Sequence, residues 1–146
     1  AVSPPLKLKR FFSKFASSLT IWNRVMTAMN MQQGKREFVD LVNEHPEINY
    51  HRLPVAGLAM MEQFMNELEE HLPIITTPAL IIQSKGDPVV DPDGTRQLFE
   101  RLASPEKEYL TFDSKRHCIL TGEGSEKVHA AIGKFIAELA TRPKKN

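Results

Sequence analysis

The second half of the chain alternates apolar, strand-like runs with helix-like segments, and this order leaves few folds open. Residues 79–82 form a continuous apolar run between turn residues, which is typical of a strand buried on both faces. A helix is predicted from Asp91 to about Leu102, a strand over 106–112 and a helix over 125–141. Strand–helix–strand units of this length close right-handedly and form parallel sheets. The sequence therefore predicts an α/β fold with two to three parallel strands and flanking helices.

The first half of the chain is mainly helical in pattern. Apolar residues recur at helical spacing from residue 6 to residue 31, as one amphipathic helix or as two with a break near Thr20. The helix is expected to end at Gly34. Residues 1–5 are expected to be the end of a short strand, ended by two prolines. The remaining predictions here are a short helix, an irregular stretch and a longer helix, at residues 36–42, 46–54 and 55–71.

Composition excludes several classes of protein. Nineteen Lys and Arg residues against eighteen Asp and Glu leave a net charge of +1, which favours neither nucleic acid nor an acidic partner. The single cysteine excludes an intrachain disulfide framework and agrees with a reducing compartment. Without a signal-peptide pattern or a long apolar run, we expect a cytoplasmic location and no membrane-spanning segment. Because the chain does not begin with Met, we also expect it to be a piece of a longer protein.

An aspartate follows the first predicted strand of the second half, and a histidine follows the next one. Adjacent parallel strands lie about 4.8 Å apart, and their carboxyl ends meet at one edge of the sheet. We therefore expect Asp87 and His117 to lie within hydrogen-bonding distance. A carboxylate on one imidazole nitrogen fixes the tautomer and stabilises the cation that forms when the other nitrogen takes a proton. The pair has the chemistry of two members of a hydrolytic triad.

Two segments around these residues carry a family resemblance. IITTPALIIQSKGDPVVDP and FDSKRHCIL, at residues 74–92 and 112–120, resemble the C-terminal part of α/β-hydrolases, and most of all the bacterial carboxylesterases and monoacylglycerol lipases. The resemblance implies that Asp87 is the triad acid and His117 the triad histidine. It also implies a helical cap region at residues 1–72 and the C-terminal α/β portion of the hydrolase core at 73–146. The implied substrates are esters with a medium or long acyl chain, without a cofactor.

The nucleophile that this family requires is missing from the sequence. No serine stands in a Gly-x-Ser-x-Gly turn, and the nearest match, Gly122 to Ser125, comes after His117, the wrong place for a nucleophile. We therefore expect a C-terminal fragment of a serine carboxylesterase or lipase-like enzyme that is inactive alone. The alternative is a non-catalytic α/β module for binding or assembly, in which Asp87 and His117 are vestigial.

Apolar side chains offer a binding site for the acyl chain of an ester or lipid. The candidate substrate-binding residues are Phe15, Trp22, Met26, Val90 and Ile119. Met-rich and aromatic surfaces adapt to varied apolar ligands, although for any one of these residues ordinary core packing is the competing explanation. A sheet of two or three strands also exposes an unpaired edge, so we expect the fragment to associate with itself.

Several polar residues have simpler explanations. Asp87 could be only a turn residue, and His117 only a solvated loop residue. Asp91 and Asp93 fit a helix cap and a first-turn charge. The other histidines have no partner at ligand spacing, so no metal site is predicted; they are His45, His51, His71 and His129. Cys118 beside His117 suggests a thiol nucleophile, but neighbours on an extended chain point apart, and a buried, inert cysteine is predicted.

Overall fold

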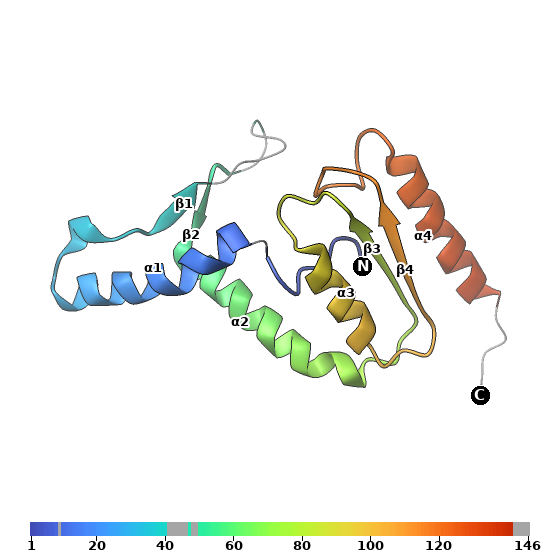
Figure 1. Cartoon of the computed structure of the whole chain (residues 1–146), viewed down its shortest axis with the longest axis horizontal. Coiled ribbons are helices and arrows are strands. Elements are labelled where there is room, and N and C mark those ends of the chain that lie inside the picture. Colours follow the sequence, from blue (N-terminus) through green and yellow to red (C-terminus); the bar gives the residue numbers. More distant parts are fainter. Residues whose placement is uncertain (9, 41–46, 48–49, 142–146) are drawn as a thin grey trace.

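The chain forms a small parallel sheet with helices on both faces and a helical arm beside it (Figure 1). The computed structural model describes residues 1–8, 10–40, 47 and 50–141, and only the backbone of residues 10–17. The elements in chain order are α1 (Arg10–Ala28), η1 (Gln32–Gly34), β1 (Phe38–Asp40), β2 (Arg52–Pro54), α2 (Val55–His71), η2 (Leu72–Ile74), β3 (Ala79–Ser84), α3 (Pro92–Arg101), β4 (Lys107–Phe112) and α4 (Ser125–Ala140).

The parallel sheet confirms the strand–helix–strand prediction. β3 pairs with β4 in parallel, in a register that runs from Ala79 opposite Lys107 to Ser84 opposite Phe112. Val2 forms an isolated parallel bridge to Ile82, on the edge of β3 that β4 leaves open. The first residues of the chain therefore lie along β3 and pair with it at Val2.

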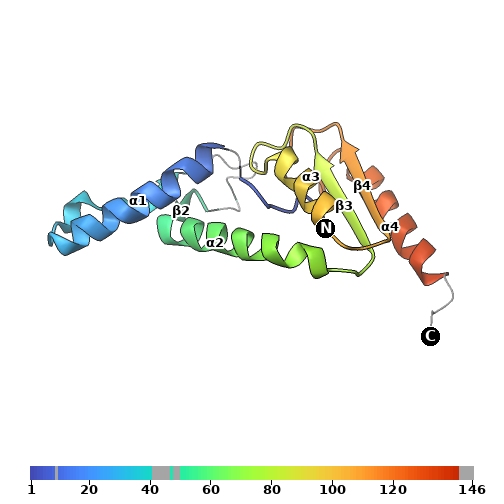
Figure 2. The same cartoon turned by 60° about the horizontal axis from the view of Figure 1, so that its bottom comes forward.

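Alternation along β3 sends its side chains into two cores. Ile81 lies in the core on the α3 side, and Ile82 lies in the core on the α4 side. The other buried members are Leu6, Leu72, Leu98 and Leu102 in the first core and Leu80, Ile119 and Val128 in the second. Because both faces of β3 are covered, its sequence is a continuous apolar run rather than an alternating one (Figure 2).

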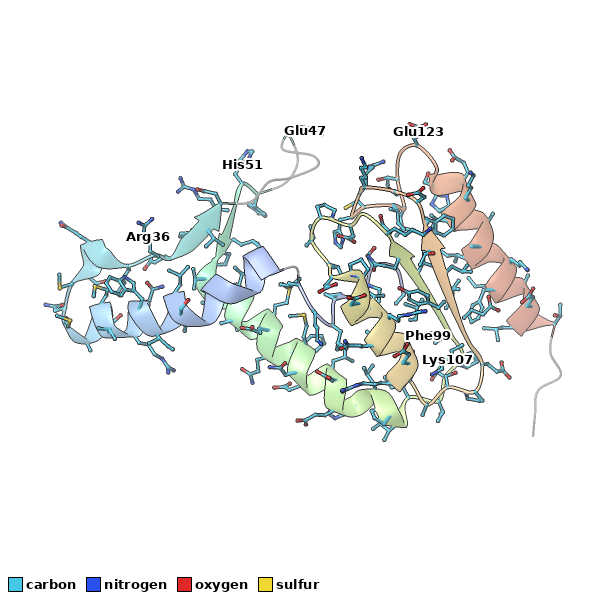
Figure 3. All side chains as sticks on the ribbon, in the orientation of Figure 1. Arg36, Glu47, His51, Phe99, Lys107 and Glu123 are labelled. Atoms are coloured by element: carbon cyan, nitrogen blue, oxygen red, sulfur yellow. The ribbon has the colours of Figure 1, made fainter. Side chains whose placement is uncertain are left out.

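The ends of α3 are fixed by side chains. Asp91 is the N-cap and accepts a hydrogen bond from the backbone N–H of Asp93 at 3.1 Å, with Pro92 at the first helical position. At the other end, Lys107 donates to the carbonyls of Phe99, Glu100 and Leu102 at 2.9, 3.1 and 2.7 Å (Figure 3). A cation on the last carbonyls of a helix is favourable. The sequence prediction of a helix beginning at Pro92 is confirmed.

The first helix is continuous through Thr20 and ends earlier than predicted. Its last residue is Ala28, not one beside Gly34. Asn30 adopts a left-handed conformation with φ of 57°, and the N–H of Met31 bonds the carbonyl of Met26 at 2.8 Å. This is the Schellman arrangement, which asparagine can close in place of glycine. Gly34 instead ends η1.

A β-ribbon replaces the short helix and the irregular stretch predicted next. β1 and β2 pair antiparallel, with Phe38 opposite Pro54 and Asp40 opposite Arg52. The latter two also form an ion pair at 3.2 Å. The helix predicted over 36–42 is therefore wrong where the structure describes it. The irregular stretch predicted over 46–54 is wrong at 52–54, which form β2, and right at 47, 50 and 51; residues 41–46 and 48–49 lie outside the described residues. α2 occupies the predicted residues, 55–71.

Two local predictions in the second half are also wrong. Gly124, with φ of 82°, is the N-cap of α4, and Ser125 is its first helical residue rather than its cap. Cys118 is exposed, because the loop that presents His117 turns its neighbour outward instead of into the core. Among the described residues, no helix is both long and apolar enough to cross a bilayer.

Candidate active site

A tight turn after β3 holds the Asp87 carboxylate. Its Oδ1 atom accepts hydrogen bonds from the backbone N–H groups of Val89 at 2.8 Å and Val90 at 2.9 Å. This is the turn-forming geometry that aspartate favours after Gly and before Pro. The Asp87 side chain is fully buried, so its four hydrogen bonds replace the water it has lost. Asp87 is therefore a turn residue whose first carboxylate oxygen builds the turn, and its second oxygen faces His117.

The loop after β4 brings His117 to this carboxylate. His117 Nδ1 lies 2.8 Å from Asp87 Oδ2, and a third of the imidazole side chain is exposed. The predicted proximity of the two residues is confirmed. Figure 3 shows this end of the sheet beneath the loop that carries Glu123.

Backbone contacts bind the two loops together beyond the last strand pair. The Ser84 hydroxyl and the Gly86 N–H donate to the carbonyl of Ser114 at 2.7 and 2.8 Å. A Cβ atom at Gly86 would lie 2.8 Å from that same carbonyl oxygen, so a larger residue would separate the loops. Glycine at this position therefore permits the close approach on which the pair depends.

The electrostatics of the pair set the direction of its hydrogen bond. Burial raises the pKa of Asp87. The hydrogen bonds from His117 and from the Val90 and Val89 amides, together with the His117 charge, lower it by more, so the pKa lies below the usual value for aspartate. An ionised carboxylate can only accept, so the proton of the imidazole must be on Nδ1. In the neutral ring, Nε2 then carries the lone pair that can accept a proton.

The other predicted site residues fall into three groups. Val90 and Ile119 are buried, and they are close in sequence to Asp87 and His117, respectively. Trp22 is half exposed and donates to the Gly34 carbonyl at 2.8 Å, and the buried Met26 packs under the same glycine. These two lie in the C-terminal half of α1, which points away from the sheet, and the structure does not bring them to Asp87 and His117 (Figures 1 and 2). The Phe15 side chain lies outside the described residues.

Two residues of the site were not anticipated. Gln83 Nε2 lies 3.2 Å from Asp87 Oδ2, and the Thr95 hydroxyl donates to Gln83 Oε1 at 2.9 Å. Both side chains are fully buried. The available signal was a polar residue at the end of an apolar strand, because a buried amide must find partners. In the described part of the chain, no three His, Cys, Asp or Glu side chains are grouped as a metal ion would require.

Comparisons with known proteins give the family of the chain. The family model described as serine aminopeptidase, S33, matches residues 1–124. The thermostable monoacylglycerol lipase of Bacillus sp. (strain H-257) is 32% identical over 71 residues, which are 49% of this chain and 28% of that protein.

Solved structures of lipolytic enzymes share the fold over 94% of the chain. They include a structure reported for the metagenome-derived lipolytic enzymes LipS and LipT, with a TM-score of 0.73 and 21% identity over 53% of that chain. The monoacylglycerol lipase of Paleococcus ferrophilus has a TM-score of 0.69 and 19% identity over 58% of its chain. A soluble variant of Saccharomyces cerevisiae monoglyceride lipase has a TM-score of 0.67 and 12% identity over 51%. The present chain thus spans about half the length of these structures.

Proposed function

Since this chain belongs to the serine aminopeptidase S33 family of α/β-hydrolases, we propose that it is the acid and histidine part of a lipase- or esterase-like enzyme. The observation that carries the proposal is the 2.8 Å contact between His117 Nδ1 and a buried, ionised Asp87. The catalytic serine belongs to a part of the enzyme outside these 146 residues, because no serine here stands on a Gly-x-Ser-x-Gly turn.

In the complete enzyme, His117 Nε2 takes the proton of the serine hydroxyl as its oxygen attacks the ester carbonyl. The imidazolium then gives that proton to the departing alcohol, which leaves an acyl-serine. Water attacks the acyl-serine by the same route, and the acid and the free serine are released. Asp87 stays ionised throughout and stabilises the imidazolium that forms in each half of the cycle.

The proposed substrates are esters with a medium or long acyl chain. The names of the similar proteins, which include monoacylglycerol and monoglyceride lipases, support an ester of glycerol as substrate and do not specify the acyl length. Residues 1–72 act as the cap region and 73–146 as part of the hydrolase core. Of the five predicted substrate-binding residues, Val90 and Ile119 are proposed to contact the acyl chain, because they lie beside Asp87 and His117 in the sequence; Trp22 and Met26 pack around Gly34 instead and are left out of this proposal.

The test is ester hydrolysis by the longer protein that contains this chain. We expect turnover of p-nitrophenyl esters, and a loss of about 10²–10⁴-fold in His117→Ala. The matched control is His71→Ala, because His71 lies at the end of α2 with its Nδ1 on the Glu67 carbonyl of its own helix. Equal rates for His117→Ala and the wild type would refute the proposal and favour the non-catalytic module. The 146-residue chain alone should show no turnover.

We further propose that the isolated chain associates with itself. An apolar groove of about 490 Å³ runs beside β3, and its lining includes Val2, Leu72, Leu80, Ile82 and Phe135. Apolar surface of this kind, next to a sheet edge that residues 1–3 pair along a short length through the Val2–Ile82 bridge, favours association. Light scattering after size-exclusion chromatography checks this, and a monomer that persists at high concentration would contradict it.

A further inference from the structure

We propose that Gln83, oriented by Thr95, is a positioning residue for the Asp87 carboxylate. The proposal rests on the function proposed above only in naming Asp87 the triad acid. Gln83 is the fifth residue of β3, and Thr95 lies in the first turns of α3. Both side chains are fully buried, so neither can exchange its partner for water.

Hydrogen-bond chemistry fixes the orientation of the Gln83 amide. The two groups near its Nε2 atom are the Asp87 carboxylate at 3.2 Å and the Ser84 carbonyl at 3.0 Å. Both can only accept, so the NH₂ group must face them and Oε1 must face the other way. Oε1 then needs a donor, and the Thr95 hydroxyl supplies it at 2.9 Å. The hydrogen bonds therefore run in one direction, from the threonine to the glutamine to the aspartate.

The hydrogen bond from Gln83 connects the Asp87 carboxylate to the sheet, which the bonds within the turn do not. The Val89 and Val90 amides hold Oδ1, but they belong to the same turn and move with it. Gln83 belongs to the hydrogen-bonded ladder of the sheet, so its bond to Oδ2 fixes the turn relative to β3 and β4. His117 is the other partner of Oδ2, and its ring is one-third exposed. Gln83 therefore keeps Oδ2 in place when the ring moves or changes its charge.

The Thr95 hydroxyl has two acceptors within reach. Its single proton goes to Gln83 Oε1 at 2.9 Å, and the carbonyl of Pro4 lies farther away, at 3.2 Å. Leucine and valine of similar size would fill the two positions without any need for partners. A polar network that is satisfied at every buried atom instead gives a single arrangement, and it specifies where the carboxylate points.

The experiment measures solvent exchange of the His117 Nδ1 proton by NMR in the 146-residue chain, with histidine labelled by ¹⁵N. Thr95→Val and Thr95→Ser form a matched pair that differs in the hydroxyl group. We expect Thr95→Val and Gln83→Met to raise the exchange rate about tenfold, the effect of losing one hydrogen bond, and Thr95→Ser to stay within about twofold of the wild type. Backbone amides of β4 serve as the internal control, because general loosening of the fold would speed their exchange as well.

Unchanged exchange in a folded Gln83→Met or Thr95→Val protein would overturn the proposal, and so would equal exchange in the two Thr95 variants. If Gln83→Met does not fold, the Thr95 pair still decides. Acceleration of the β4 amides to the same degree would assign the two residues a structural role only and would also overturn it. The measurement needs neither the serine nor an ester. Failure of ester hydrolysis in the longer protein would therefore leave this result to stand on its own.

Discussion

Replacing Asp87 with asparagine keeps the shape of the side chain but changes one of its two acceptor oxygens into an NH₂ group, which can only donate. The amide oxygen can take the place of Oδ1 and accept from the Val89 and Val90 N–H groups. The amide nitrogen then takes the place of Oδ2, where it faces Gln83 Nε2 and His117 Nδ1. Both were donors to Asp87. The imidazole can adapt by moving its proton to Nε2, but the Gln83 amide cannot, because its nitrogen also serves the Ser84 carbonyl.

The expected loss of stability follows from these four bonds. Two bonds to backbone amides change from charge-assisted to neutral, which costs about 1 kcal/mol each, and a buried donor left opposite another donor costs about 1–3 kcal/mol. Removing a buried charge offsets part of this sum. We therefore expect Asp87→Asn to lower the free energy of unfolding by about 2 kcal/mol, which is about 1 M in the urea midpoint.

Urea unfolding followed by circular dichroism measures this loss, and ¹⁵N shifts of the imidazole report the tautomer. Asp113→Asn is the matched control, since Asp113 is an exposed aspartate of the loop that carries His117. Its free energy of unfolding should change by no more than about 0.5 kcal/mol. The reasoning is refuted if Asp87→Asn behaves like Asp113→Asn and His117 still carries its proton on Nδ1.

Three further outcomes are expected. Because the pKa of Asp87 is lowered on folding, its stabilisation is present above the unfolded-state value near 3.9 and is lost as the pH falls through the folded-state pKa. Urea midpoints of wild type and Asp87→Asn should converge in acid, and a constant difference would contradict this. Gly86→Ala places a methyl group 2.8 Å from the Ser114 carbonyl, so we expect a loss of about 1–3 kcal/mol and faster exchange of the His117 Nδ1 proton. Asp91→Ala removes the N-cap of α3 and should lower the free energy of unfolding by about 1 kcal/mol in the same assay. Asp91→Asn should keep most of that stability, because asparagine also caps helices.

Sequence patterns predicted the elements that bury much apolar surface. α2 and β3 have strong periodicity or a continuous apolar run, and Asp91 with Pro92 marks the start of α3 by a local hydrogen bond. The contact between Asp87 and His117 could be predicted as well, because parallel strands bring their carboxyl ends together.

The remaining features depend on contacts that periodicity does not encode. β1 and β2 are three residues each and largely exposed, so their ribbon depends on pairing across the chain rather than on a pattern of buried residues. The left-handed conformation of Asn30 ends α1. Asparagine and glycine both adopt this conformation, and because Asn30 and Gly34 lie close together, the sequence does not show which of them ends the helix. Gln83 interrupts an apolar strand, but only the fold shows that Thr95 and Asp87 lie on either side of its amide.

The last rung of the β3–β4 ladder, Ser84 opposite Phe112, has a consequence for how the chain can change. Asp87 and His117 stand 30 residues apart, yet each is only a few residues from that rung, and the C-terminal end of α3 lies outside both short loops. Insertions or deletions near the C-terminal end of α3 should therefore be tolerated by the pair. One residue added between Ser84 and Asp87, or between Phe112 and His117, should separate it. The length of each loop is counted from the Ser84–Phe112 rung, so these two short loops are the places where a change of one residue alters the geometry of the pair.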